Sequence, residues 1–321
     1  MRDDRYTIKG TRGERREVRG ERSDSGYRGR FAPSPTGPLH FGSLVAAVAS
    51  YLDAKSRGGE WLVRMDDLDP PRVVRSAADE ILRALEACGM QWDGAVICQS
   101  VRFDAYHAAL HRLRALGKVY PCACSRREIG DSAVSGIEGP VYPGTCRDGL
   151  AAGKTARAWR IDTRGAKIEF DDAVQGRLQQ NLETDIGDFV LYRADHVFAY
   201  QLAIVVDDAG QGITDIVRGA DLLDSTPRQI YLQQLLGFPT PRYAHVPVAV
   251  NAAGEKLSKQ TRAAAIDAQR PLPALLAALD FLGQHPPRDP GPANIAALWD
   301  WAIANWNIGR VPRKKAVMND G

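Results

Sequence analysis

One junction near the start of the chain, residues 28–55, restricts the possible folds more than any other stretch. It begins as a short run flanked by apolar residues and is then broken by three prolines and a glycine before His40. From Leu44 to Lys55 it contains neither residue type and is rich in Ala, Val and Leu. This order predicts a strand, a rigid loop and a buried helix.

The start of that helix has the properties of a phosphate-binding site. A helix N-terminus presents unpaired backbone N–H groups and the positive end of the helix dipole. Gly42 allows a ligand to approach the backbone closely, and His40 can donate to phosphate oxygens. For His40 in isolation, an ordinary helix cap with a structural histidine is the favoured interpretation.

The rest of the chain alternates strands and helices in the way that is typical of a doubly wound parallel sheet. A strand at 61–65 completes a first βαβ unit with residues 28–55. Further strands are predicted at 198–206 and 244–250, and helices at 76–90, 103–116, 226–236, 273–282 and 295–306. Shorter strands, such as 156–161 and 188–192, indicate an insertion into the α/β domain.

The predicted domain order follows from this alternation. It is a basic extension at 1–27, a first half of the α/β domain at 28–117, an inserted subdomain at 118–191, a second half at 192–260 and a helical C-terminal part at 261–321. The extension contains too few apolar residues to order itself, so it is expected to be disordered. A solvated tail or a misplaced start codon is favoured over the third alternative, an arm that touches RNA.

Composition and charge narrow the class of protein. The chain has 321 residues, a formal net charge of +3 and five cysteines, and this charge does not by itself indicate nucleic-acid binding. No apolar run approaches the roughly 18 residues of a membrane helix, and the first residues lack the apolar core of a signal peptide. An odd number of cysteines argues against a disulfide framework. We therefore expect a cytoplasmic, monomeric protein that does not bind membranes.

Motifs spread over residues 28–310 resemble those of the class I glutamyl-tRNA synthetases. They are R-F-A-P-S-P-T-G, H-F-G-S, W-L-V-R-M-D-D-L-D-P-P-R, C-Q-S-V-R, F-A-Y-Q-L-A-I-V-V-D-D, I-V-R-G-A-D-L and K-L-S-K. The resemblance implies a Rossmann-type catalytic domain that activates an amino acid as its adenylate. The chain has no P-loop sequence, so nucleotide binding of the P-loop type is not expected.

The resemblance implies that ATP binds with Mg²⁺ at the H-F-G-S and K-L-S-K motifs. The implied residues are His40, Gly42, Ser43, Lys256, Ser258 and Lys259. Two lysines on a loop can straddle a triphosphate and offset the charge that develops as pyrophosphate leaves. Adenylation needs alignment and charge rather than proton abstraction, so we assign no general base.

The resemblance also implies a glutamate site. Its residues are Arg30, Phe31, Ala32, Pro33, Ser34, Asp66, Tyr200 and Arg218. Arg30 is expected to meet the glutamate side chain, because a guanidinium matches a carboxylate in geometry. The family usually reads R-x-E-D where this chain has Asp66, which keeps the charge and is one methylene shorter. The alternative to a glutamate-binding role for Arg218 is an ordinary ion pair with Asp215 or Asp221.

Full-length members of this family continue into a helical domain that reads the anticodon, and the chain is too short to include it. It thus resembles the short paralogues that transfer glutamate to the queuosine base in the anticodon loop of tRNA(Asp). We expect ATP, L-glutamate and that loop as partners. Two alternatives stay open: a truncated synthetase that charges a tRNA acceptor end, and a non-catalytic synthetase-like regulator that binds RNA.

Three cysteines and a tyrosine in the predicted insertion are candidate metal ligands. Cys122, Cys124 and Cys146 could form a closed tetrahedral site with a fourth, oxygen ligand, and a zinc ion would stabilise a region with little core. The short paralogues bind zinc through three cysteines and a tyrosine, which implies Tyr142 as the fourth ligand. The alternative to a metal site is that the three cysteines are free thiols.

Overall fold

The structure is a computed structural model that describes residues 26–74, 76–132, 134–137, 139–251, 253–256, 265–288 and 291–318. The extension up to residue 25 and two predicted ATP-binding residues, Ser258 and Lys259, lie outside the described residues. Tyr27, by contrast, is buried, and its hydroxyl donates to Asp53 at 2.7 Å. The prediction placed Tyr27 at the end of the extension. Tyr27 belongs to the folded core instead, because its ring packs among the core residues.

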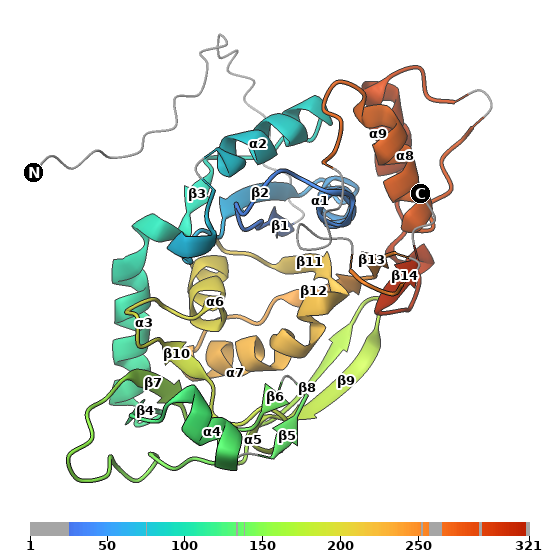
Figure 1. Cartoon of the computed structure of the whole chain (residues 1–321). Coiled ribbons are helices and arrows are strands. Elements are labelled where there is room, and N and C mark those ends of the chain that lie inside the picture. The colour runs from blue at the N-terminus through green and yellow to red at the C-terminus, as the bar shows by residue number, and fades with distance from the viewer. Residues whose placement is uncertain are drawn as a thin grey trace, which may run out of the picture.

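A parallel sheet forms the first half of the α/β domain. β1 (Arg28–Phe31) pairs in parallel with β2 (Glu60–Met65), and β2 pairs in parallel with β3 (Ile97–Cys98). α1 (Phe41–Lys55) connects β1 to β2, and α2 (Ala77–Ala87) precedes β3 (Figure 1). Most of α1 is buried, which explains why its sequence is apolar on every side.

The second half of the domain continues this arrangement. β11 (Asp215–Gly219) pairs in parallel with β12 (Arg242–Val246), and α7 (Thr226–Leu236) connects them. β11 lies beside β1, since the Thr214 N–H donates to the Arg28 carbonyl at 3.0 Å. The spatial order β3, β2, β1, β11, β12 confirms the predicted doubly wound parallel fold.

The strand predicted at 198–206 is wrong, because this segment forms the helix α6 (Tyr200–Gly210). Residues 202–206 are all buried, so the helix has no polar face over this stretch. A short, fully buried apolar run has the same sequence pattern in a strand and in a helix. The correction places Tyr200 at the start of a helix.

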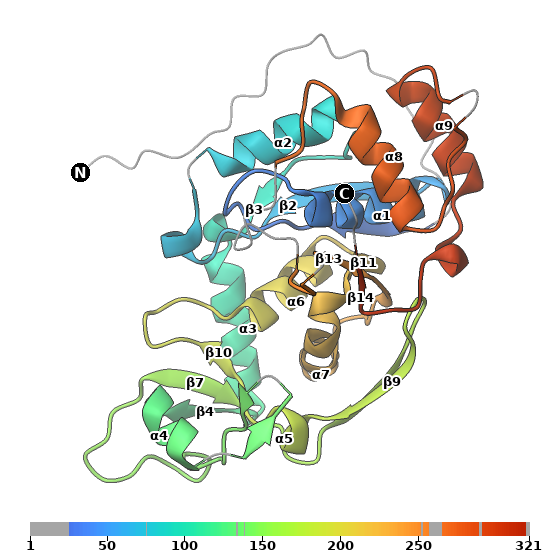
Figure 2. The ribbon, with the colours of Figure 1, turned by 45° about the vertical axis from the view of Figure 1, so that its right-hand side comes forward.

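The predicted insertion contains short strands and helices. They are β4 (Val119–Cys122), α4 (Arg126–Ser132), β5 (Ser135–Gly136), β6 (Gly139–Pro140), β7 (Ala158–Ile161), β8 (Lys167–Asp172), β9 (Gly176–Asn181), α5 (Leu182–Asp185) and β10 (Val190–Tyr192). β10, β7 and β4 form an antiparallel sheet. β8 and β9 instead extend the sheet of the α/β domain, because Asp172 of β8 pairs with Tyr243 of β12. Figure 2 shows this hairpin running from the insertion up to the α/β domain.

The C-terminal part packs on the α/β domain. Its elements are α8 (Pro271–Phe281), α9 (Ile295–Asn305), η5 (Ile308–Arg310) and β14 (Ala316–Met318). The α/β domain also contains η1 (Pro70–Arg72), η2 (Gln99–Val101), α3 (Phe103–Ala115), η3 (Ala220–Ser225) and β13 (Val248–Val250). α8 and α9 are helices as predicted, and β14 pairs in parallel with β13. Within the described residues, no helix combines the length and the apolar character needed to cross a membrane.

Candidate active site

A cleft of about 480 Å³ opens at the carboxyl ends of β1 and β11, beside the start of α1. This is the edge at which doubly wound sheets bind their ligands. Every described residue that the sequence predicted for ATP or glutamate lines this one cleft. These residues are Arg30, Phe31, Ala32, Pro33, Ser34, His40, Gly42, Ser43, Asp66, Tyr200, Arg218 and Lys256.

The N-terminus of α1 forms one end of the cleft. His40 is its N-cap residue, with an extended backbone, and its Nδ1 accepts from the Ser43 N–H at 3.3 Å. Burial and the nearby Lys256 lower the pKa of His40, although Asp221 opposes this, so the ring is neutral at pH 7. The first N–H groups of a helix have no partner inside the helix. This end of the cleft therefore offers donors to an anion.

A lysine adds positive charge at the same end. Lys256 Nζ lies 2.5 Å from Asp221 Oδ2, and both residues line the cleft. Lys256 directly precedes residues 257–264, which are outside the described residues. A cation and a helix N-terminus thus face one cavity, which is an arrangement suited to a phosphate chain.

A buried cluster of charges forms the other end. Arg30 donates through Nε and Nη2 to the two carboxylate oxygens of Asp208, at 3.2 and 3.4 Å. Arg64 Nη1 donates to Asp208 at 2.7 Å, and Arg64 Nε donates to Asp66 Oδ1 at 2.8 Å. The second oxygen of Asp66 is buried without a hydrogen-bond partner. Burial raises the pKa of Asp66 to about 6, although Arg64 lowers it.

Arg218 does not form an ion pair with Asp215 or Asp221, which was the alternative to a role in substrate binding. Asp215 pairs with Arg242 at 2.6 Å, and Asp221 pairs with Lys256. Arg218 instead donates to neutral groups on β12 and α7, and its Nη1 is buried without a hydrogen-bond partner. Two residues that line the cleft, Arg218 and Asp66, therefore each contain one buried polar atom without a hydrogen-bond partner.

The sequence reasoning missed four buried groups that support these side chains. Asp208 holds Arg30 and Arg64, and Asp207 accepts from Gln99 at 2.9 Å. His245 contacts Arg218, and Asp172 contacts His245. The signal that could have revealed the first pair is V-V-D-D, because two adjacent carboxylates after an apolar run need buried cationic partners.

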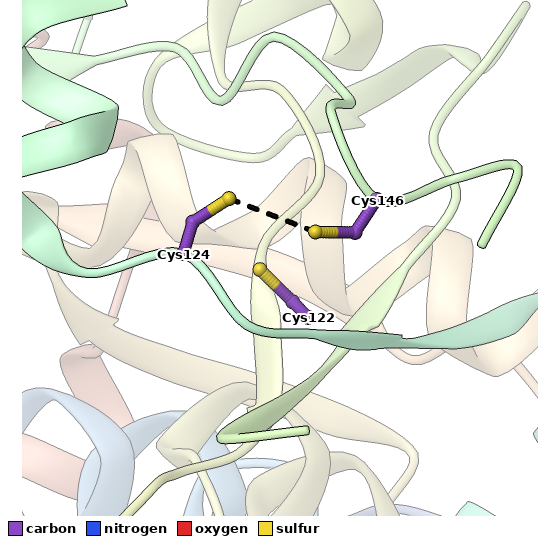
Figure 3. Close-up of side chains that lie close together, drawn as sticks. All are labelled: Cys122, Cys124 and Cys146. Atoms are coloured by element: carbon purple, nitrogen blue, oxygen red, sulfur yellow. Dashed lines mark hydrogen bonds between the residues drawn. The ribbon is translucent and has the colours of Figure 1, made fainter. Parts of the chain in front are cut away.

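The three cysteines predicted as metal ligands lie together in the insertion (Figure 3). The three sulfur atoms of Cys122, Cys124 and Cys146 are all within 4.8 Å of one another, with 3.6 Å between the last two. The Tyr142 hydroxyl is 3.4 Å from the first sulfur and 3.5 Å from the second. Tetrahedral zinc with bonds of about 2.3 Å to sulfur and 2.0 Å to oxygen requires separations of about 3.8 and 3.5 Å. The four groups therefore fit a zinc ion.

Known proteins resemble this chain over most of its length. The family model described as "tRNA synthetases class I (E and Q), catalytic domain" matches residues 27–270. A glutamyl-Q tRNA(Asp) synthetase from Dechloromonas aromatica is 60% identical over 297 residues, which is 92% of this chain and 99% of that protein. One from Cupriavidus metallidurans is 62% identical over 263 residues, 80% of this chain and 84% of that protein.

Solved structures share the fold. A glutamate–tRNA ligase from Elizabethkingia meningosepticum, crystallised with its amino acid, superposes with a TM-score of 0.75 at 23% identity. The match covers 91% of this chain and 66% of that one. A glutamate–tRNA synthetase from Elizabethkingia anophelis gives the same TM-score over 92% of this chain and 68% of its own.

Proposed function

The chain belongs to the glutamyl-Q tRNA(Asp) synthetase family of class I synthetase ligases, and we propose that it transfers L-glutamate to the queuosine base of tRNA(Asp). In the proposed reaction ATP first activates glutamate, without tRNA, and the adenylate then reacts with the base at the wobble position. One observation carries the proposal. A single cleft is lined by the N-terminal residues of α1 and by Lys256, which suit a phosphate chain, and also by Asp66, Arg30 and Arg218, which suit an amino acid.

The first step needs an amino acid and a triphosphate side by side. An oxygen of the glutamate α-carboxylate attacks the α-phosphorus, the bond from this phosphorus to the bridging oxygen breaks, and pyrophosphate leaves. His40, Gly42 and Ser43 are proposed to bind the phosphates, with Lys256, Ser258 and Lys259 stabilising the leaving group. Mg²⁺ bound with ATP offsets phosphate charge, as in class I synthetases.

Glutamate recognition is proposed to use the other end of the cleft. The unpaired oxygen of Asp66 accepts from the substrate ammonium, and Arg30 and Arg218 receive its carboxylates. Tyr200 and the backbone from Arg30 to Ser34 line the space between them. A neutral or cationic side chain in place of the glutamate carboxylate would leave a buried guanidinium unpaired, which makes the site selective.

The second step transfers glutamate to RNA. A hydroxyl of the queuosine ring attacks the carbonyl of the adenylate, an ester forms and AMP leaves. An anticodon loop suits this reaction because unpaired bases can be turned outward into a protein cleft. A monomer as the active form and a cytoplasmic location are part of this proposal.

The insertion is proposed to bind a structural zinc ion. Cys122, Cys124, Cys146 and Tyr142 would hold it, since their separations fit tetrahedral coordination. A zinc ion closed off by four protein ligands stabilises local structure and takes no part in the reaction. The cleft residues lie outside this cluster, so the chemistry of adenylation is assigned to the cleft alone.

The test is glutamate transfer to tRNA of two kinds. The purified protein is incubated with ATP, labelled glutamate and total tRNA from cells that make queuosine or lack it, and glutamate-dependent pyrophosphate exchange is followed without tRNA. We expect exchange without tRNA and label only on queuosine-containing tRNA. Equal label on both tRNA preparations would show acceptor-end charging instead. A protein with neither label nor exchange would be a non-catalytic binder.

A further inference from the structure

Three buried side chains form a row that ends at the cleft. Asp172 at the end of β8 lies 2.6 Å from His245 Nδ1 on β12, and His245 Nε2 lies 3.0 Å from Arg218 Nε on β11. All three side chains are buried, with His245 completely inaccessible to solvent. Of the three, Arg218 alone lines the cleft, so Asp172 and His245 can act on a ligand only through Arg218.

The hydrogen bonds around Asp172 fix the proton on His245. Asp172 Oδ1 accepts from the backbone N–H groups of Val174, Gln175 and His245, at 3.0, 2.9 and 3.1 Å. The other oxygen, Oδ2, is the one that faces His245 Nδ1. Burial lowers the pKa of His245 to about 4, although Asp172 raises it, so the ring is neutral at pH 7. The single ring proton therefore sits on Nδ1, and Nε2 accepts from Arg218.

The remaining bonds of Arg218 leave one nitrogen available. Its Nη2 donates to Thr226 Oγ1 and to Gln229 Oε1, each at 2.8 Å. Its Nε donates to His245. Its Nη1 is buried and has no hydrogen-bond partner, although an unpaired guanidinium nitrogen is costly inside a protein. A bound carboxylate would satisfy it.

We propose that Asp172 and His245 are positioning residues that fix the Arg218 guanidinium so that Nη1 receives a carboxylate of the substrate amino acid. This inference rests on the proposed function and adds two residues that contribute to the specificity for glutamate. It also links the insertion to the cleft, because β8 lies in the segment predicted as the insertion while Arg218 lies on the catalytic sheet.

The substitution Asp172→Asn tests the role of the ring proton. The three backbone donors require an oxygen at Oδ1, so the new amide N–H₂ occupies the Oδ2 position and donates to His245 Nδ1. The ring proton then moves to Nε2 and opposes the Arg218 N–H. An aspartate that fixes the tautomer of a catalytic histidine fails in the same way when it becomes asparagine. Size and backbone bonds are preserved.

We expect the KM for glutamate in pyrophosphate exchange to rise about tenfold or more in Asp172→Asn, which is typical when a supporting partner is lost. The KM for ATP should stay unchanged and kcat should change less than KM, because the lost interaction is ground-state binding. His245→Asn is the second variant. Its amide can still donate to Asp172 and is too short to reach Arg218, so the same rise in KM is expected.

Two further measurements separate positioning from general support of the fold. Nitrogen NMR of the ring should report a proton on Nδ1 in the parent protein and on Nε2 in Asp172→Asn, with no substrate present. Asp215→Asn is the matched control, since it changes another buried carboxylate on the same sheet that pairs with Arg242. It should leave the KM for glutamate unchanged even where it lowers thermal stability.

The outcomes separate the inference from the function on which it rests. A parent protein without glutamate-dependent exchange would overturn the proposed function and the role of the two residues with it. Exchange in the parent protein with an unchanged KM for glutamate in both variants would overturn the positioning role alone. Equal losses for glutamate and ATP, matched by Asp215→Asn, would also overturn it, because they would show a structural role.

Discussion

Two buried carboxylates that both accept from Arg64 show how neighbours set the properties of a single residue. Asp208 accepts from Arg30 and from Arg64, and although burial opposes its ionisation these arginines hold its pKa below the ordinary value. Asp66 accepts from Arg64 through one oxygen only, and burial raises its pKa to about 6. The first carboxylate supports the cleft, and the second is available to a ligand.

The pKa of Asp66 leads to a prediction about pH. A substrate ammonium binds the ionised carboxylate, so proton binding to Asp66 competes with glutamate. We expect the KM for glutamate to rise as the pH falls through about 6. Pyrophosphate exchange between pH 5 and 8 measures it. Asp66→Asn should bind glutamate weakly at every pH, and a parent protein with a flat KM would remove Asp66 from the site.

Removal of Asp208 should destabilise the protein strongly. Asp208→Ala leaves Arg30 and Arg64 buried without their shared partner, and breaking such a pair costs about 3–5 kcal/mol. The same change at Asp215 should cost less, because its partner Arg242 is 70% exposed and stays hydrated. Urea unfolding of both variants measures the difference. Equal losses would show that the arginine cluster does not depend on Asp208.

At the scale of elements, sequence reasoning succeeded where local patterns decide and failed where burial removes them. α7 carries proline near its start and Gly237, with a φ of 62°, directly after its last residue, so both ends could be read from the sequence. α6 is buried over most of its length, and its periodicity is lost. The residues of the cleft were predicted from motifs. Asp208 and His245 were not, because their partners lie far away in the sequence.

The cysteine cluster predicts the effect of metal removal on the insertion. The buried apolar groups around it are few, namely Tyr120, Cys122, Tyr142 and Cys146, so a bound metal would contribute much of the local stability beside the ion pair of Arg147 with Asp188. Cys122→Ser should release zinc and increase amide exchange between β4 and β7. Cys98→Ser, a cysteine on β3 outside the cluster, is the control. A parent protein that contains no zinc by metal analysis would contradict the four-ligand site.

At the scale of the whole molecule, the C-terminal helices share one core with α1, whose N-terminus is the proposed phosphate site. Leu275 and Leu279 of α8 and Trp299 of α9 belong to the same buried cluster as α1, β1 and β2. Figures 1 and 2 both show α8 and α9 on the side of the molecule that carries α1. The C-terminal part therefore supports the catalytic domain directly, although it contributes none of the predicted substrate-binding residues.

This shared core predicts that a substitution in α9 acts on the distant cleft through stability. Trp299 is buried, its ring lies 5.0 Å from that of Tyr51 on α1, and its Nε1 donates to the Cys88 carbonyl at 2.8 Å. Trp299→Ala should therefore cost about 3–5 kcal/mol. Because α1 also carries His40 at its N-terminus, exchange activity and folded structure should be lost over the same temperature range.

The matched control lies on the same helix. Trp301 is only partly buried against this core, so Trp301→Ala should cost clearly less. Calorimetry and pyrophosphate exchange measured over the same temperatures compare the variants. If Trp299→Ala unfolded α9 alone, calorimetry would show a separate early transition while exchange persisted above it. That result would mean that the C-terminal helices fold on their own. One core that contains both α1 and α9 predicts instead a single transition with simultaneous loss of pyrophosphate exchange.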